Sequence, residues 1–74
     1  MESSLSSFPI NSKVKILSLR LQETDMIRKL ASLGISPGAA VIIHQNSPML
    51  LISAGQTMVA IRPSIGDQII GTLT

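Results

Sequence analysis

The sequence predicts a mainly β fold: a small barrel of about five strands with one short α-helix between the first and second strands. Residues 12–19 alternate between apolar and polar side chains, residues 22–34 place apolar side chains at helical spacing, and the chain beyond residue 40 divides into short β-branched runs. Five short strands in 74 residues indicate a strongly curved sheet. We expect this sheet to close into a barrel, because closure removes unpaired edge strands.

The first strand is predicted in SKVKILSL, residues 12–19. Val14 and Ile16 fall on one face of this stretch, and Lys13 and Lys15 fall on the other. A period of two is typical of a strand that is buried on one face only.

The pattern changes to helical spacing in QETDMIRKLASLG, residues 22–34. Its apolar residues form a single stripe that consists of Met26, Ile27, Leu30 and Leu33. Acidic residues lie near the start of the segment and Arg28 and Lys29 lie further along, as the helix dipole favours. The segment is therefore predicted to be a short amphipathic helix.

Two corners are predicted to follow the helix. Gly34 can adopt the left-handed conformation that ends a helix, and Ile35 would then contact Leu30 in a Schellman ending. Pro37 and Gly38 suit the first and second central positions of a type II turn. Gly34, Pro37 and Gly38 are therefore assigned to structure, because they turn the chain from the helix into the next strand.

The remaining strands are predicted in residues 40–45, 49–54, 57–61 and 68–73. The connections NSP and GQ have the lengths of hairpin loops, whereas RPSIGD is long enough to hold one 3₁₀ turn.

The composition limits the chain to one domain, which we place at residues 12–74 after a flexible, serine-rich segment of residues 1–11. No cysteine is present, which excludes disulfides and thiolate metal ligands. The start of the chain lacks the pattern of a secretory signal, and no run approaches the roughly 20 apolar residues of a membrane span. We expect a cytoplasmic protein without direct membrane insertion.

The charge pattern argues against nucleic acid as the partner. Six basic and four acidic residues give a net charge of +2, and the only close basic pairs are Lys13/Lys15 and Arg28/Lys29. Phe8 is the only aromatic residue, so the chain has no platform on which bases could stack.

The titratable residues do not form a recognisable catalytic or metal site. His44 is the only histidine, and we expect it at the surface near a strand end. The acidic residues are dispersed, and the glycines form neither a phosphate-binding loop nor a dinucleotide fingerprint. We therefore expect no catalytic residues, no metal ligands and no cofactor.

Apolar residues on the predicted outer face exceed what folding requires. The alternation that supplies the core also turns Ile42, Met49, Leu51 and Met58 outward. Either the helix and the N-terminal arm cover these side chains, or they bind a protein partner or a second copy of the chain. The residue pattern leaves both interpretations open.

Two stretches resemble the FeoA family: RKLASLGISPGAAVII at residues 28–43 and TMVAIRPSIGDQIIGTL at residues 57–73. The resemblance implies an SH3-like β-barrel and a small cytoplasmic accessory protein of bacterial ferrous iron uptake. It also implies a partner, the membrane permease FeoB with its GTPase domain, and neither catalysis nor iron ligation. The chain departs from the family pattern in its clipped loop NSPM, residues 46–49. The same domain is also appended to metal-dependent transcriptional repressors.

We therefore predict a non-enzymatic module that acts by binding a protein, with a homo-oligomer left open. Arg28 and Lys29 are the predicted polar contacts to the partner, and Met49, Leu51 and Met58 are the predicted apolar contacts. The alternative is a small RNA- or ribosome-associated β-barrel, which would differ from a protein-binding module in the salt dependence of binding.

Overall fold

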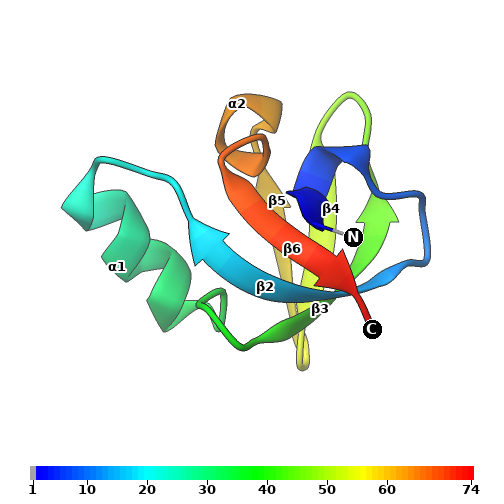
Figure 1. Ribbon diagram of the computed structural model, residues 1–74, viewed down its shortest axis with the longest axis horizontal. Helices are drawn as coiled ribbons and strands as arrows, with labels where there is room; N and C mark the ends of the chain where they lie inside the picture. Colours follow the sequence, from blue (N-terminus) through cyan, green and yellow to red (C-terminus); the bar gives the residue numbers. More distant parts are fainter. Residues whose placement is uncertain (1) are drawn as a thin grey trace.

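The computed structural model describes residues 2–74 and shows six antiparallel strands in one strongly curved sheet (Figure 1). The strand order across the sheet is β1-β6-β2-β3-β4-β5. The strands are β1 (Glu2–Ser4), β2 (Lys13–Leu19), β3 (Ala40–Gln45), β4 (Leu50–Ala54), β5 (Thr57–Ile61) and β6 (Ile69–Leu73). A 3₁₀ turn, η1 (Leu5–Ser7), follows β1, the helix α1 (Thr24–Ser32) connects β2 to β3, and a short helix, α2 (Pro63–Gly66), precedes β6.

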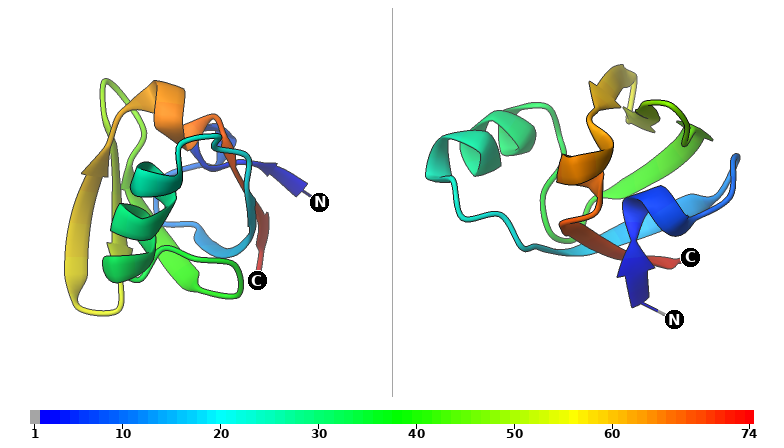
Figure 2. Two further views of the ribbon diagram at one scale, coloured as in Figure 1. Left: turned by 90° about the vertical axis from the view of Figure 1, so that its left-hand side faces the viewer. Right: turned by 90° about the horizontal axis from the view of Figure 1, so that it is seen from above.

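The predicted mainly β architecture is confirmed, but the sheet differs from the expected closed barrel of about five strands. A sixth strand is present, and β1 and β5 form the two edges of the sheet. The closed barrel was expected because closure removes edges, yet here the curved sheet stays open between β1 and β5 (Figure 2).

The extra strand lies in residues 1–11, the segment that we expected to be flexible. Ser3 pairs with Gly71 of β6, and the side chains of Leu5 and Phe8 are 0% and 6% exposed. The structure therefore differs from the expectation, because these two apolar side chains are part of the core. The burial of Leu5 and Phe8 was not predicted, because serines surround them in the sequence. Met1 lies outside the described residues.

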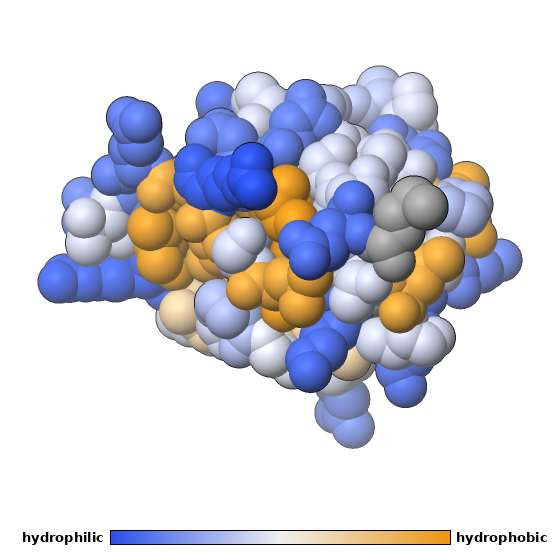
Figure 3. Space-filling view, viewed as in Figure 1, coloured by the Kyte–Doolittle hydropathy of each residue, from blue (hydrophilic) through white to orange (hydrophobic). Residues whose placement is uncertain are grey.

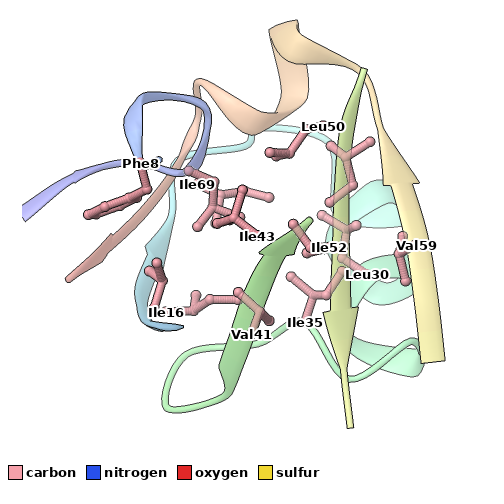
Figure 4. Close-up of a cluster of buried hydrophobic side chains, with 13 residues drawn as sticks. Phe8, Ile16, Leu30, Ile35, Val41, Ile43, Leu50, Ile52, Val59 and Ile69 are labelled. Carbon is pink, nitrogen blue, oxygen red and sulfur yellow. The ribbon is translucent and has the colours of Figure 1, made fainter. Parts of the chain in front are cut away.

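The core is aliphatic apart from Phe8 and has no buried polar or charged residue among residues 2–74 (Figure 4). It follows the predicted alternation along the strands. Its members are Leu5, Phe8, Val14, Ile16, Leu30, Ile35, Val41, Ile43, Leu50, Ile52, Val59, Ile61 and Ile69.

The corner after α1 has the predicted Schellman geometry. Gly34 has a φ of 92°, its N–H donates to the carbonyl of Ala31 at 3.0 Å, and the N–H of Ile35 donates to the carbonyl of Leu30 at 2.9 Å. Ile35 and Leu30 are both buried. The helix therefore ends by a local mechanism and leads directly into the core.

The second corner also has the predicted geometry. Gly38 has a φ of 94°, and the N–H of Ala39 donates to the carbonyl of Ser36 at 2.9 Å, as a type II turn requires. The turn is attached to β2, because the N–H of Gly38 donates to the carbonyl of Ile16 at 2.7 Å and the N–H of Ile16 donates to the carbonyl of Ala39 at 2.8 Å. The C-terminal end of α1 is thus fixed to the sheet by backbone hydrogen bonds.

The connection between β3 and β4 holds the clipped NSPM loop, residues 46–49. Its Ser47–Pro48 peptide bond is cis, and the Asn46 side chain donates from Nδ2 to the carbonyl of Phe8 at 3.1 Å. The loop thereby contacts the residue at which the N-terminal arm enters the core.

Candidate functional site

His44 lies at the surface, where the sequence placed it, on the outer face of β3. Its Nε2 is 2.8 Å from the hydroxyl oxygen of Ser53 on β4. The carboxylate of Asp67 accepts a hydrogen bond from Ser6 instead of orienting this imidazole. Residues 2–74 contain no group of three or more His, Cys, Asp or Glu side chains that could hold a metal ion.

The predicted apolar contacts lie on the outer face of β4 and β5 and at the start of β4. Met49 and Met58 are 37% and 55% exposed, and Leu51 is half-buried. Leu51 pairs with Ala60, and Met58 pairs with Ser53. These side chains therefore alternate with buried Leu50, Ile52 and Val59 of the same strands, as predicted.

A hollow lies elsewhere, between α1, β5 and α2. This hollow, which we call the α1–β5 groove, has a volume of about 260 Å³. Residues of α1 and β5 both line it, and the left view of Figure 2 shows these two elements beside each other. It is lined by Met26, Lys29, Leu30, Leu33, Val59, Ala60, Ile61, Arg62 and Ile65.

The α1–β5 groove combines apolar walls with two cations. Leu30, Val59 and Ile61 are buried at its base. Lys29 and Arg62 are exposed, and no acidic residue lines this hollow. Figure 3 shows hydrophobic side chains gathered between α1 and the neighbouring elements, with hydrophilic ones around them. The groove can therefore receive an apolar side chain with an acidic group beside it.

A second hollow of about 230 Å³ adjoins the groove and shares Met26 and Ile65 with it. Its other lining residues are Leu21, Gln22, Glu23 and Gln68. The charged residue in this hollow is Glu23, so the two hollows differ in the sign of their charge.

The strand beside the groove is the open edge of the sheet. Thr57 pairs with Ala54 across the two-residue turn Gly55–Gln56, and these two residues exchange backbone hydrogen bonds. Along an antiparallel pair of strands, every second residue pair is hydrogen-bonded, so Val59 and Ile61 also bond to β4 whereas Met58 and Ala60 do not. The backbone N–H and C=O groups of Met58 and Ala60 therefore point away from β4.

The structure does not bring the five predicted contact residues together. Lys29 lines the groove, Arg28 is exposed on α1 without lining it, and the three apolar residues lie on the outer face of the sheet. Sequence reasoning missed Arg62 and Ile65. The RPSIGD connection was interpreted only as a turn, although it places a cation and an apolar side chain directly after an uncharged strand.

Comparisons with known proteins agree on the family. The model of the FeoA domain matches residues 3–73. No curated protein sequence matches the chain.

Several solved structures share the fold. An iron uptake regulatory protein (FeoA) is 24% identical with a TM-score of 0.86, over 100% of this chain and 99% of that chain. IdeR of T. acidophilum is 19% identical with a TM-score of 0.89, over 99% of this chain and 34% of that chain, so the chain spans about a third of that protein.

A third structure is the zinc complex of FeoA from Stenotrophomonas maltophilia, described as a prokaryotic SH3 domain protein. It is 26% identical with a TM-score of 0.76, over 96% of this chain and 88% of that chain. The predicted SH3-like architecture is thereby confirmed. Because the FeoA domain model matches nearly all of its length, the chain belongs to the FeoA family.

Proposed function

We propose that the chain is an accessory protein of bacterial ferrous iron uptake that acts in the cytoplasm by binding the soluble GTPase region of a FeoB-type permease. The observation that carries the proposal is the match of the FeoA domain to residues 3–73. The Stenotrophomonas maltophilia relative has been described as a candidate activating factor of ferrous iron transport, which supports the same process for this chain.

Binding rather than catalysis suits the side chains. The single imidazole faces a serine hydroxyl on the outer face of the sheet, at the surface, and general acid–base catalysis requires a second titratable group and a substrate pocket beside it. The apolar walls of the α1–β5 groove are instead typical of a surface that a protein partner covers. Among residues 2–74, none of the helices has the length and apolar composition of a membrane span.

The test is a binding measurement between the purified chain and the soluble region of the permease at about 50 and about 200 mM salt. We expect saturable binding whose affinity changes by less than about tenfold, because apolar contacts are not screened by salt. An RNA-binding protein that makes several phosphate contacts would lose on the order of 10³-fold in affinity over this range. Absence of binding to the permease region at both salt concentrations would refute the proposal, and a structured RNA in place of the permease provides the comparison.

A further inference from the structure

The β5 edge lacks the devices that proteins use to protect an edge strand. Such devices include charged residues, proline, bulges and very short strands. Thr57–Ile61 contains no charge and no proline, and its register with β4 is regular over all five pairs. The exposed backbone groups of Met58 and Ala60 are therefore available to a further strand.

The α1–β5 groove lies where the inward-facing side chains of such a strand would point. Val59 and Ile61 face the core side of the sheet and also line the groove, and the opposite wall is the apolar stripe of α1. Side chains on one face of an added strand would continue the row of Val59 and Ile61 beneath α1.

The size of the groove favours a few side chains of a partner, rather than a cofactor, as its occupant. Its volume of about 260 Å³ lies below the roughly 300–1,000 Å³ of small-molecule sites. The lining residues also lack an aromatic ring on which a nucleotide base could stack.

Charge complementarity indicates which charged group the bound segment carries near its apolar side chains. Lys29 on α1 and Arg62 at the end of β5 are both exposed and line the same groove, which contains no carboxylate of its own. A carboxylate on the bound segment would pair with these two cations and would be disfavoured elsewhere along the apolar wall.

We propose that the α1–β5 groove binds an extended, acidic segment of the protein partner, which adds to β5 as a seventh strand. Its apolar side chains enter the groove against Leu30, and a carboxylate two residues further along, on the same face of the added strand, meets Lys29 and Arg62. This inference rests on the proposed function for the identity of the partner. The mode of recognition is β-augmentation, in which main-chain hydrogen bonds provide affinity and alternate side chains provide specificity.

The first experiment uses the ¹⁵N-labelled chain and a synthetic peptide of sequence TLTVTE, titrated by NMR, in which Leu, Val and Glu share one face of an extended strand. We expect shifts in the amides of Met58, Ala60 and the groove-facing turns of α1. A matched peptide, TLTVTQ, keeps the shape and removes the side-chain charge, and we expect it to bind about tenfold more weakly. Equal binding of the two peptides would overturn the role of the cations, and the absence of shifts in β5 would overturn the proposal itself.

Variants of the chain then distinguish the effect of the two groove cations from the effect of net charge on peptide binding. The double variant Lys29→Glu with Arg62→Glu should bind TLTVTE at least about tenfold more weakly than the native chain. The control, Lys15→Glu with Lys13→Glu, makes the same change in net charge at exposed positions outside the groove. We expect it to change affinity by less than about threefold, and equal losses in the two double variants would refute the assignment.

A backbone variant tests the added strand. Ala60→Pro removes the N–H that faces the open edge and leaves the hydrogen bonds to β4 in place. We expect it to abolish peptide binding while Ala60→Thr retains it, with the ¹⁵N spectrum of each variant reporting whether the fold is intact. If Ala60→Pro disturbs the fold, the Lys29/Arg62 comparison decides the question alone.

The same variants in the permease assay distinguish this inference from the proposed function. If the permease region binds the native chain and the Lys29/Arg62 variant equally well, the groove assignment is wrong and the proposed function stands. If the permease region does not bind but TLTVTE binds as described, the proposed function is wrong and the groove assignment stands. Groove shifts that depend on protein concentration, with dimers in sedimentation, would identify a second copy as the occupant and would overturn the proposal.

Discussion

The two edges of the sheet differ in how well they are protected from pairing with another strand. At the β1 edge the strand is three residues long, begins with a charged residue, and continues into a turn whose Leu5 is fully buried. The hydroxyl of Ser7 donates to the carbonyl of Ser4 at 2.7 Å, which holds this turn against its own strand. At the β5 edge the strand is five residues long, uncharged and regular, and it borders the α1–β5 groove. A small domain can thus protect one edge with its own N-terminus and leave the other accessible to a partner.

The largest expected effect concerns the protected edge. Leu5→Ala should reduce the free energy of unfolding by about 2–5 kcal/mol, because it removes a fully buried side chain from the core. Urea unfolding measures this change. The control is Ile10→Ala, which truncates a side chain that is 52% exposed and should cost less than about 0.5 kcal/mol. Equal costs for the two variants would show that the N-terminal arm does not belong to the core.

The pairing of β6 with its neighbours should be nearly as sensitive. A Cβ added at Gly71 would lie 2.5 Å from Val14 Cγ1 and 2.9 Å from the backbone oxygen of Lys15, so Gly71→Ala should cost about 1–3 kcal/mol. Gly66→Ala is the matched substitution, because its new Cβ meets the flexible end of Leu50, at 2.7 Å from Cδ2. We expect thermal denaturation to show a larger loss for Gly71→Ala, and the reverse order would contradict the close packing of β6 against β2 at Gly71.

The corner that positions α1 beside the open edge should have an intermediate effect. Gly34 has a φ of 92°, so Gly34→Val should lower the free energy of unfolding by at least about 1 kcal/mol by forcing a β-branched residue into the left-handed region. Gly34→Asn should cost less, since asparagine tolerates this conformation. A melting temperature for Gly34→Val that equals the native value would refute the assignment of this residue as the helix C-cap.

The smallest effect is expected on the outer face of the open edge. Met58 is 55% exposed and points away from the groove side of β5, so Met58→Lys should change stability by no more than about 0.5 kcal/mol. It should also leave binding of the permease region unchanged within about threefold. A loss of binding much larger than this, with the stability unaltered, would instead favour the outer face of Met49, Leu51 and Met58 as the contact surface.

Local signals account for the parts of the fold that could be predicted. Gly34 and the pair Pro37 and Gly38 turn the chain through their own backbone preferences. The strands after residue 40 are recognisable from the sequence because inward and outward side chains alternate between adjacent residues. The strand in residues 2–4 has no such signal. Its three residues include two serines, and its position depends on Gly71, which is distant in the sequence.

The candidate site was only partly predictable for the same reason. Lys29 was identified from its exposure on an amphipathic helix. Arg62 and Ile65 become relevant only when α1, β5 and α2 lie around one hollow, and this arrangement depends on how α1 sits relative to the sheet. The outward-facing residues were correctly placed on the strands, but a period of two specifies the face of a strand and not the distance to a helix.

The two adjoining hollows beside α1 have a consequence for the direction in which a segment binds. The cations Lys29 and Arg62 lie in one hollow and Glu23 lies in the other, with Met26 and Ile65 shared between them. A segment long enough to reach from one hollow into the other would meet cations at one end and a carboxylate at the other. A segment with a carboxylate at one end and a cation at the other should therefore bind in a single orientation, and the same residues in reverse order should bind less well. The surface would then select the direction of the bound chain as well as its composition.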